Sequence, residues 1–163
     1  MDVNQIVLNN LLLKFDQIKS RMLFVIEQLN DEKLNWRPNE ESNSIANLVL
    51  HISGNIHQRI EAGILGLEDN RDRDGEFDVN QTLSKKEVIE LIQRNFHFLE
   101  VTIKKLTCEG LLRLQKVRNN NVTVLDVLLQ CSTHFSEHLG QILYIGKMKL
   151  NKDYITTSIP RKK

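Results

Sequence analysis

Apolar residues recur every three or four positions along four long stretches of this chain, and that spacing is the strongest constraint on its fold. In the first stretch the recurring positions are Val3, Val7, Leu11, Phe15, Ile18, Met22, Val25 and Leu29. Such spacing places the apolar side chains on one face of an amphipathic α-helix, whose start Asp2 can cap. Because the chain has only 2 Pro and 7 Gly in 163 residues, few positions interrupt long regular elements, and helix is favoured.

Capping residues mark the starts of the other three predicted helices. Ser44, Ser84 and Thr123 each precede a stretch with helical apolar spacing, and a serine or threonine oxygen accepts a hydrogen bond from a free amide at a helix start. Glu87 completes a capping box after Ser84. The predicted ends of these helices lie near Gly63 and Gly66, near Leu106, and near Gly146.

The segments between the helices lack the helical period and are predicted as connections. Residues 30–44 contain Pro38, which stops a helix. Residues 67–82 are acidic and contain Gly and Asn, which is typical of a long crossover or lid. Residues 107–122 form another loop, with room for a short hairpin around 114–117.

The four apolar stripes predict an all-α fold, because a four-helix bundle buries four such stripes against one another. A chain of 163 residues fits one domain, predicted to span residues 1–163, and is long enough to bury a hydrophobic core. The tail after Gly146 carries Tyr154, Ile155 and Ile159 and is expected to pack along the outside of the bundle.

The balance of charges excludes some classes of partner. Lys and Arg number 22 against 21 Asp and Glu, a formal net charge of +1, so no overall field draws the protein to nucleic acid or to a membrane surface. The basic residues 161–163 are interpreted as a solvated end. The sequence shows no signal peptide and no uncharged stretch near the length of a membrane span. Together with only two cysteines, Cys108 and Cys131, this predicts a cytoplasmic, reducing location.

His134 and His138 form the sharpest local feature, since four positions separate them. On a helix that spacing puts both imidazoles on one face, where one metal ion can accept a nitrogen from each. The alternative is a pair of partly exposed surface histidines. His51 occupies a matching border of the second helix, where it completes three ligands or instead bonds a backbone carbonyl at the core edge. Three protein nitrogens would leave coordination positions open for water or substrate, as in catalytic sites.

Three further residues that can bind metals are assigned other roles. His57 lies about 240° round the second helix from His51 and is predicted to face solvent. His97, on the third helix, is predicted not to be a ligand. Cys131 lies one turn before His134 and is either a substitute ligand or a small core residue.

Four other residues are candidates for binding a substrate near the histidines. Gln141 follows the histidine pair by one turn and either holds substrate or is a solvated amide. Arg59 lies about two turns beyond His51 and either pairs with a carboxylate of a substrate or thiol cofactor or forms a surface salt bridge. Asn55 is a candidate for orienting an imidazole. Trp36 either walls the pocket or packs into the core.

These features together resemble the DinB/YfiT-like superfamily of metal-dependent bundle enzymes over nearly the whole chain. That family has one histidine midway along the second helix and a His-x-x-x-His pair on the fourth, the places of His51, His134 and His138. Further matching motifs are Leu34-Asn35-Trp36-Arg37-Pro38, Gly54-Asn55 with Arg59, and Gly140-Gln141-Ile142. The resemblance implies an up-down-down-up four-helix bundle, a homodimer, and a divalent ion, commonly nickel or zinc, held by the three histidines in an open pocket.

The resemblance also implies a class of reaction. Members with known activity include thiol S-transferases that use bacillithiol, mycothiol or glutathione, and a mycothiol-dependent isomerase. An ion held by three neutral histidines can lower the pKa of a bound thiol or water toward neutrality. We therefore expect an enzyme that transfers a low-molecular-weight thiol to an electrophilic small molecule. Two alternatives stay open: a metal-dependent hydrolase, and a non-catalytic dimeric stress-response bundle protein.

Overall fold

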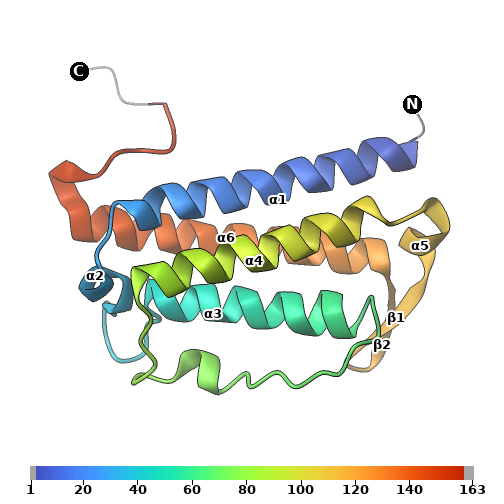
Figure 1. Cartoon of the computed structure of the whole chain (residues 1–163), viewed down its shortest axis with the longest axis horizontal. Helices are drawn as coiled ribbons and strands as arrows, with labels where there is room; N and C mark the ends of the chain where they lie inside the picture. Colours follow the sequence, from blue (N-terminus) through green and yellow to red (C-terminus); the bar gives the residue numbers. More distant parts are fainter. Residues whose placement is uncertain (1–2, 160–163) are drawn as a thin grey trace.

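The protein is mostly helical in a computed structural model that describes residues 3–159 (Figure 1). Its long helices are α1 (Val3–Glu27), α3 (Ile45–Ile56), α4 (Lys85–Lys104) and α6 (Val124–Leu150). In Figure 1, α1 and α6 run in one direction along the molecule, and α3 and α4 run in the opposite direction. Asp2, the predicted cap of the first helix, and the basic residues 161–163 lie outside the described residues.

The hydrophobic core lies between the four long helices. Helix α1 packs against α4 and α6, and α3 packs against the same two helices. Near the middle of this arrangement the ring centroid of Phe135 on α6 lies 6.0 Å from that of Phe15 on α1 and 6.1 Å from that of Phe96 on α4. Met22 and Ile52 are almost completely buried in the same core. The stripes recognised in the sequence are therefore the faces that the helices bury against one another.

Side-chain caps start α3, α4 and α6 at the predicted positions. In each case the cap side chain accepts a hydrogen bond from the backbone amide three residues later, and the side chain there accepts one from the backbone of the cap. The capping pairs are Ser44 with Asn47, Ser84 with Glu87, and Thr123 with Asp126. The first of these starts fixes the register of α3, and hence the position of His51 along it.

The end of α6 differs from the prediction. The sequence predicts an end near Gly146, but α6 continues past it, and the residue after the helix, Asn151, has a φ of 50°. A Cβ at Gly146 would lie 2.6 Å from Cγ1 of Val25, so this glycine lets α1 approach α6 closely and does not end the helix. The tail packs beside α1 as expected, where Gln28 exchanges two hydrogen bonds with the backbone of Ile155.

Short elements occupy the segments that are predicted as connections. Their bounds are α2 (Asp31–Asn35), α5 (Cys108–Leu112), β1 (Leu114–Val117), β2 (Asn120–Thr123) and η3 (Asn151–Asp153). The expected hairpin is present, because β1 pairs with β2 in antiparallel register. The short helices α2 and α5 are corrections to the predicted loops, since single turns are too short to show an apolar period.

Helix α3 continues directly into a π-helical segment, η1 (His57–Ala62). The crossover segment, residues 67–82, then runs beside α3 toward the start of α4 (Figure 1). It contains the short 3-10 helix η2 (Gly75–Phe77), which packs against α3. The predicted lid is therefore attached to the helix that carries His51. Within the described residues, none of the helices combines the length and apolar character that a membrane crossing requires.

Candidate metal centre

The structure brings the three predicted histidines together at the border between α3 and α6. His51 Nε2 lies 3.2 Å from His134 Nε2, and His138 Nε2 lies 2.6 Å from the same atom. One nitrogen from each ring lies within 4.8 Å of the other two. Two of the rings share a face of α6 because they are four residues apart, and α3 supplies the third because it packs against α6.

The donor set fits a divalent ion of the transition series. Imidazole nitrogens bind zinc at about 2.0–2.1 Å, which in a tetrahedral arrangement separates the nitrogens by roughly 3.3 Å. The distance between His51 and His134 already matches that separation, and His138 needs only a small outward shift. Imidazole ligands suit zinc, nickel, copper and iron. The geometry therefore supports a metal site without selecting the ion.

The environment keeps two of these rings neutral, which is the form that binds a metal. Burial, followed by the neighbouring His138 and His51, lowers the pKa of His134 to about 4. Burial also lowers the pKa of His51, although the hydrogen bond that His51 donates to Glu76 opposes that shift. Near neutral pH both rings therefore have a nitrogen lone pair available, since a protonated imidazole has none.

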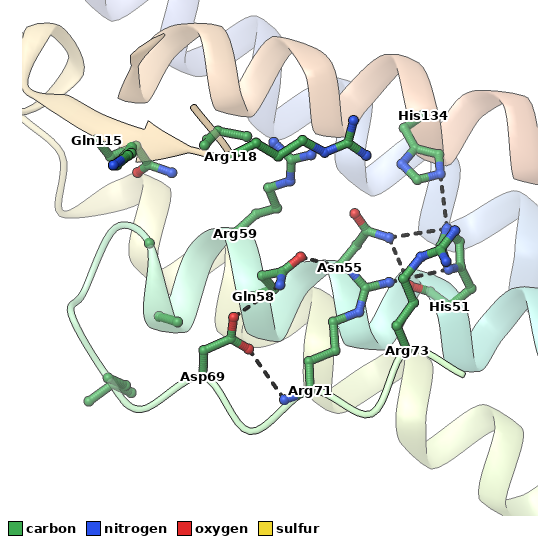
Figure 2. A pocket seen from close by; sticks show the side chains of 15 residues that line it. His51, Asn55, Gln58, Arg59, Asp69, Arg71, Arg73, Gln115, Arg118 and His134 are labelled. Carbon is green, nitrogen blue, oxygen red and sulfur yellow. Dashed lines mark hydrogen bonds between the residues drawn. The ribbon is translucent and has the colours of Figure 1, made fainter. Parts of the chain in front are cut away.

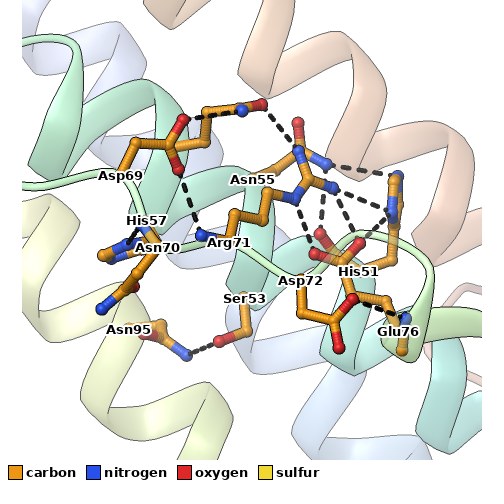
Figure 3. Close-up of polar contacts among 12 residues, drawn as sticks. His51, Ser53, Asn55, His57, Asp69, Asn70, Arg71, Asp72, Glu76 and Asn95 are labelled. Atoms are coloured by element: carbon orange, nitrogen blue, oxygen red, sulfur yellow. Dashed lines mark hydrogen bonds and ion pairs between the residues drawn. The ribbon is translucent and has the colours of Figure 1, made fainter.

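A buried carboxylate orients His51 (Figure 3). Glu76 Oε2 lies 2.9 Å from His51 Nδ1, and both residues are 7% exposed. Arg71 holds the same carboxylate through Nε at 2.6 Å and Nη2 at 2.7 Å. Because a carboxylate only accepts hydrogen bonds, His51 donates from Nδ1, and its Nε2, which faces the other histidines, is unprotonated. A carboxylate behind a ligating histidine is a common feature of metal sites.

Two further polar side chains, Gln141 and Asn55, contact histidines of the cluster. His138 Nδ1 lies 3.0 Å from Gln141 Oε1, so the amide oxygen accepts its proton and directs Nε2 toward the cluster. Asn55 donates to the backbone oxygen of His51 at 3.1 Å, and its amide nitrogen lies 3.2 Å from His51 Nε2. Two of the four substrate-binding candidates therefore contact the histidines, Gln141 through His138 and Asn55 through His51.

Gly54 makes room for the ion pair that backs His51. A Cβ at this position would overlap the Glu76 carboxylate and would lie 2.9 Å from Arg71 Nε. The pair thus packs directly on the backbone of α3. Glycine is unfavourable inside a helix, so close approach of the ion pair is the physical reason for its presence here.

A cavity of about 810 Å³ opens beside the cluster (Figure 2). His51 and His134 border it, together with Asn55 and Arg59. Its volume is within the range of sites for small molecules. Trp36 lies elsewhere: its ring packs against the core, with Lys149 Nζ 4.3 Å from its centroid, which agrees with its packing role.

The other metal-binding side chains lie outside the cluster. His57 is half-buried, with Nδ1 2.8 Å from Glu61 Oε2, so the prediction that it faces solvent is wrong. The crossover segment covers part of this face of the helix, where the backbone amide of Asn70 donates to His57 Nε2 at 3.4 Å. His97 is exposed on α4. Cys131 is a buried core residue, and burial raises the pKa of its thiol to about 12.

Glu76, Arg71 and Gly54 are the parts of the site that the histidine pattern did not reveal. Glu76 and Arg71 lie in the crossover segment, which has no period to predict which side chains point inward. Gly54 belongs to one of the motifs that carry the family resemblance. Its role, however, depends on close approach of Glu76, which lies 22 positions later in the chain. A long-range pairing of this kind has no local sequence signal.

Comparisons with known proteins add a family and a structural neighbour. The family model described as "Protein of unknown function (DUF1572)" matches residues 2–163. A solved structure described as the conserved protein of locus from Enterococcus faecalis is similar to this chain, with 16% sequence identity and a TM-score of 0.72. The likeness covers 91% of this chain and 97% of that one, and at this identity it shows the fold alone. A comparison with curated proteins found no match.

Proposed function

We propose that this chain, which belongs to the DUF1572 family, is a metal-dependent enzyme of the DinB/YfiT-like kind. The opposed directions of the long helices in Figure 1 support the up-down-down-up four-helix bundle of that group. The observation that carries the proposal is the convergence of His51, His134 and His138 on one point beside a cavity. A homodimer and a cytoplasmic location are further parts of the proposal, and the sequence resemblance alone supports them.

The three histidines would hold a divalent ion, with nickel and zinc as the first candidates. When bound, such an ion supplies a Lewis acid that lowers the pKa of a thiol or of water. His51, His134 and His138 contribute neutral nitrogens, so the ion would keep its full charge for that purpose. Glu76 and Gln141 fix two of the rings by accepting their Nδ1 protons.

The proposed reaction is the transfer of a low-molecular-weight thiol to an electrophilic small molecule. The sulfur forms a bond to an electrophilic carbon, the thiol proton is lost to solvent, and the leaving group of the substrate takes the electron pair of the bond that breaks. The cavity beside His51 and His134 has room for both reactants. Arg59 lines this cavity and would pair with a carboxylate of the thiol or of its acceptor.

Elemental analysis of protein purified without a histidine tag tests the metal site. We expect close to one nickel or zinc ion per chain after loading, and a large loss of ion in His51→Ala, His134→Ala and His138→Ala. His57→Ala is the matched control, because His57 is also half-buried on the same stretch of helix but pairs with Glu61. Retention of ion at the wild-type level in any two of the three ligand variants would refute the assignment.

Activity assays with a panel of electrophiles then test the reaction. Bacillithiol, mycothiol and glutathione are each supplied with the metal-loaded protein, and a parallel series omits the thiol. Consumption of substrate only when a thiol is present supports the transferase. Turnover without thiol would instead support hydrolysis at the same site, and loaded protein that is inert in both series would favour a non-catalytic bundle protein.

A further inference from the structure

The cavity beside the histidines has a strongly cationic lining. Five of its lining residues carry arginine or lysine side chains, namely Arg59, Arg71, Arg73, Lys116 and Arg118, whereas Asp69 is the acidic residue among them. The whole chain has a formal net charge of only +1. The concentration of cations at this cavity is therefore a local feature and does not follow from the overall composition.

Four of these cations are not neutralised by a carboxylate within the part of the chain that the structure describes. Arg71 is paired with Glu76. The described ion pairs include none that involves Arg59, Arg73, Lys116 or Arg118. Asp69 accepts hydrogen bonds from Gln58 and from the backbone of Arg71. A group of like charges around a cavity repels itself, so a bound anion would stabilise it.

The four cations without a described carboxylate partner reach the cavity from three separate parts of the fold. Arg59 lies on η1, Arg73 on the crossover segment, and Lys116 and Arg118 at the hairpin. Figure 2 shows Arg59 and Arg118 extending into the same space beside α6. Arg59 is half-buried, whereas the other three are exposed at the rim. An anion can therefore be surrounded by these side chains, with Arg59 as the inner contact.

The backbone at Arg118 supports a role for its side chain. Arg118 has a φ of 54°, in the left-handed region that favours glycine or asparagine. It opens the two-residue turn between β1 and β2, and Asn119 follows it. An arginine is a poor choice for this turn on conformational grounds. Strained positions of this kind are found where a side chain has a function.

The cationic side chains of the cavity extend close to the histidines. Arg71 Nη2 lies 3.3 Å from His51 Nδ1, and Figure 2 shows the Arg73 side chain beside His51. A ligand whose anionic group is held by these cations can therefore have its reactive group at the histidines.

We infer that this cavity binds an anionic small molecule, through a carboxylate or phosphate held by Arg59, Arg73, Lys116 and Arg118. The inference rests on the proposed function for the role of the histidine end, and it names the class of substrate or thiol that this site accepts. The anion subsite itself depends on the cations alone. Arginine suits it because its planar guanidinium group binds carboxylate and phosphate oxygens in pairs.

Titration calorimetry with simple anions tests the subsite. Succinate and inorganic phosphate are the probes, which separate carboxylate from phosphate recognition, and succinamide is the uncharged analogue of succinate. We expect saturable binding of at least one anion, no binding of succinamide, and weakening as ionic strength rises. Arg59→Gln should weaken anion binding roughly tenfold or more, as expected for loss of a hydrogen bond to a charged group.

Two variants control for general effects of charge and of folding. Arg94→Gln removes the same charge from an exposed position on α4 outside the cavity and should bind the anion like the wild type. Arg118→Gly should weaken binding while its thermal unfolding temperature is no lower than that of the wild type, because glycine relieves the positive φ. Equal losses in Arg59→Gln and Arg94→Gln, equal binding of succinate and succinamide, or no binding of either anion would overturn the inference.

The result separates this inference from the proposed function. In His134→Ala the metal content should fall, but succinate or phosphate should still bind, because His134 is not one of the four cations. Wild-type protein that binds an anion but no nickel or zinc would refute the metal-dependent enzyme and leave the anion subsite standing. Protein that binds metal but neither anion would refute the anion subsite and leave the metal-dependent enzyme standing.

Discussion

Replacement of Glu76 by glutamine should weaken metal binding although Glu76 is not a ligand. The Glu76 carboxylate lies 2.9 Å from His51 Nδ1 and accepts two short hydrogen bonds from Arg71. Glutamine keeps one oxygen for these donors but loses the negative charge. Loss of such a supporting group typically lowers metal affinity about 10- to 100-fold. We expect the lower end, about tenfold or 1.4 kcal/mol, because the remaining amide oxygen can still accept the Nδ1 proton of His51.

The same change should also reduce the stability of the metal-free protein. The side chains of Arg71 and Glu76 are 6% and 8% exposed, so the guanidinium group cannot exchange its lost partner fully for water. Removal of one partner of a buried pair costs about 3–5 kcal/mol. Because glutamine retains a hydrogen-bond acceptor, we expect about 1–3 kcal/mol for this variant.

Nickel affinity, measured by competition with a coloured chelator, and urea unfolding together check both effects. Glu61→Gln is the matched control, because Glu61 makes the same kind of contact, 2.8 Å to His57 Nδ1, away from the cluster. The control should bind nickel like the wild type. If folded Glu76→Gln bound nickel as tightly as Glu61→Gln, the idea that this carboxylate supports the metal ligand would be wrong.

Three further outcomes follow from the structure. Gly54→Ala should lower both stability and nickel affinity despite the better helix propensity of alanine, because its Cβ would displace the Arg71–Glu76 pair. Gly140→Ala is the control, because no atom lies near the added Cβ. It should raise the free energy of unfolding in urea by roughly 0.5–1 kcal/mol. Cys108 is exposed and should react with a thiol reagent in the native protein, whereas the buried Cys131, with a pKa of about 12, should react only after unfolding; two fast thiols in the native state would contradict its burial. Addition of nickel at 100 times its dissociation constant should stabilise the wild type by about 2.7 kcal/mol and leave His134→Ala unchanged, as measured by thermal unfolding.

The long helices could be predicted from the sequence because their signals are local. Capping pairs such as Ser84 with Glu87 involve residues three positions apart, and the apolar stripes repeat within each helix. The end of α6 was harder to place, because Gly146 resembles a helix terminator in sequence. Its actual role depends on Val25 in another helix, and no pattern within α6 contains that information.

The histidine cluster could be predicted for a similar reason, and its surroundings could not. The spacing of His134 and His138 fixes their shared face, and the proximity of the three histidines is confirmed. The prediction that His57 faces solvent was wrong because the crossover segment contacts its ring through the backbone amide of Asn70, and the helical period contains no information on that contact. Glu76 contacts a histidine 25 positions earlier in the chain, so only the folded crossover segment reveals the pairing.

Gly54 provides a criterion for deciding which related chains support their first histidine in the same way. A relative with glycine at the equivalent place has space for an arginine–carboxylate pair against its second long helix, as in this protein. A relative with a larger residue there would have to support its first histidine by another group or leave that ring unsupported. One position that touches no metal can thus indicate which relatives share this type of centre, before any of them is purified.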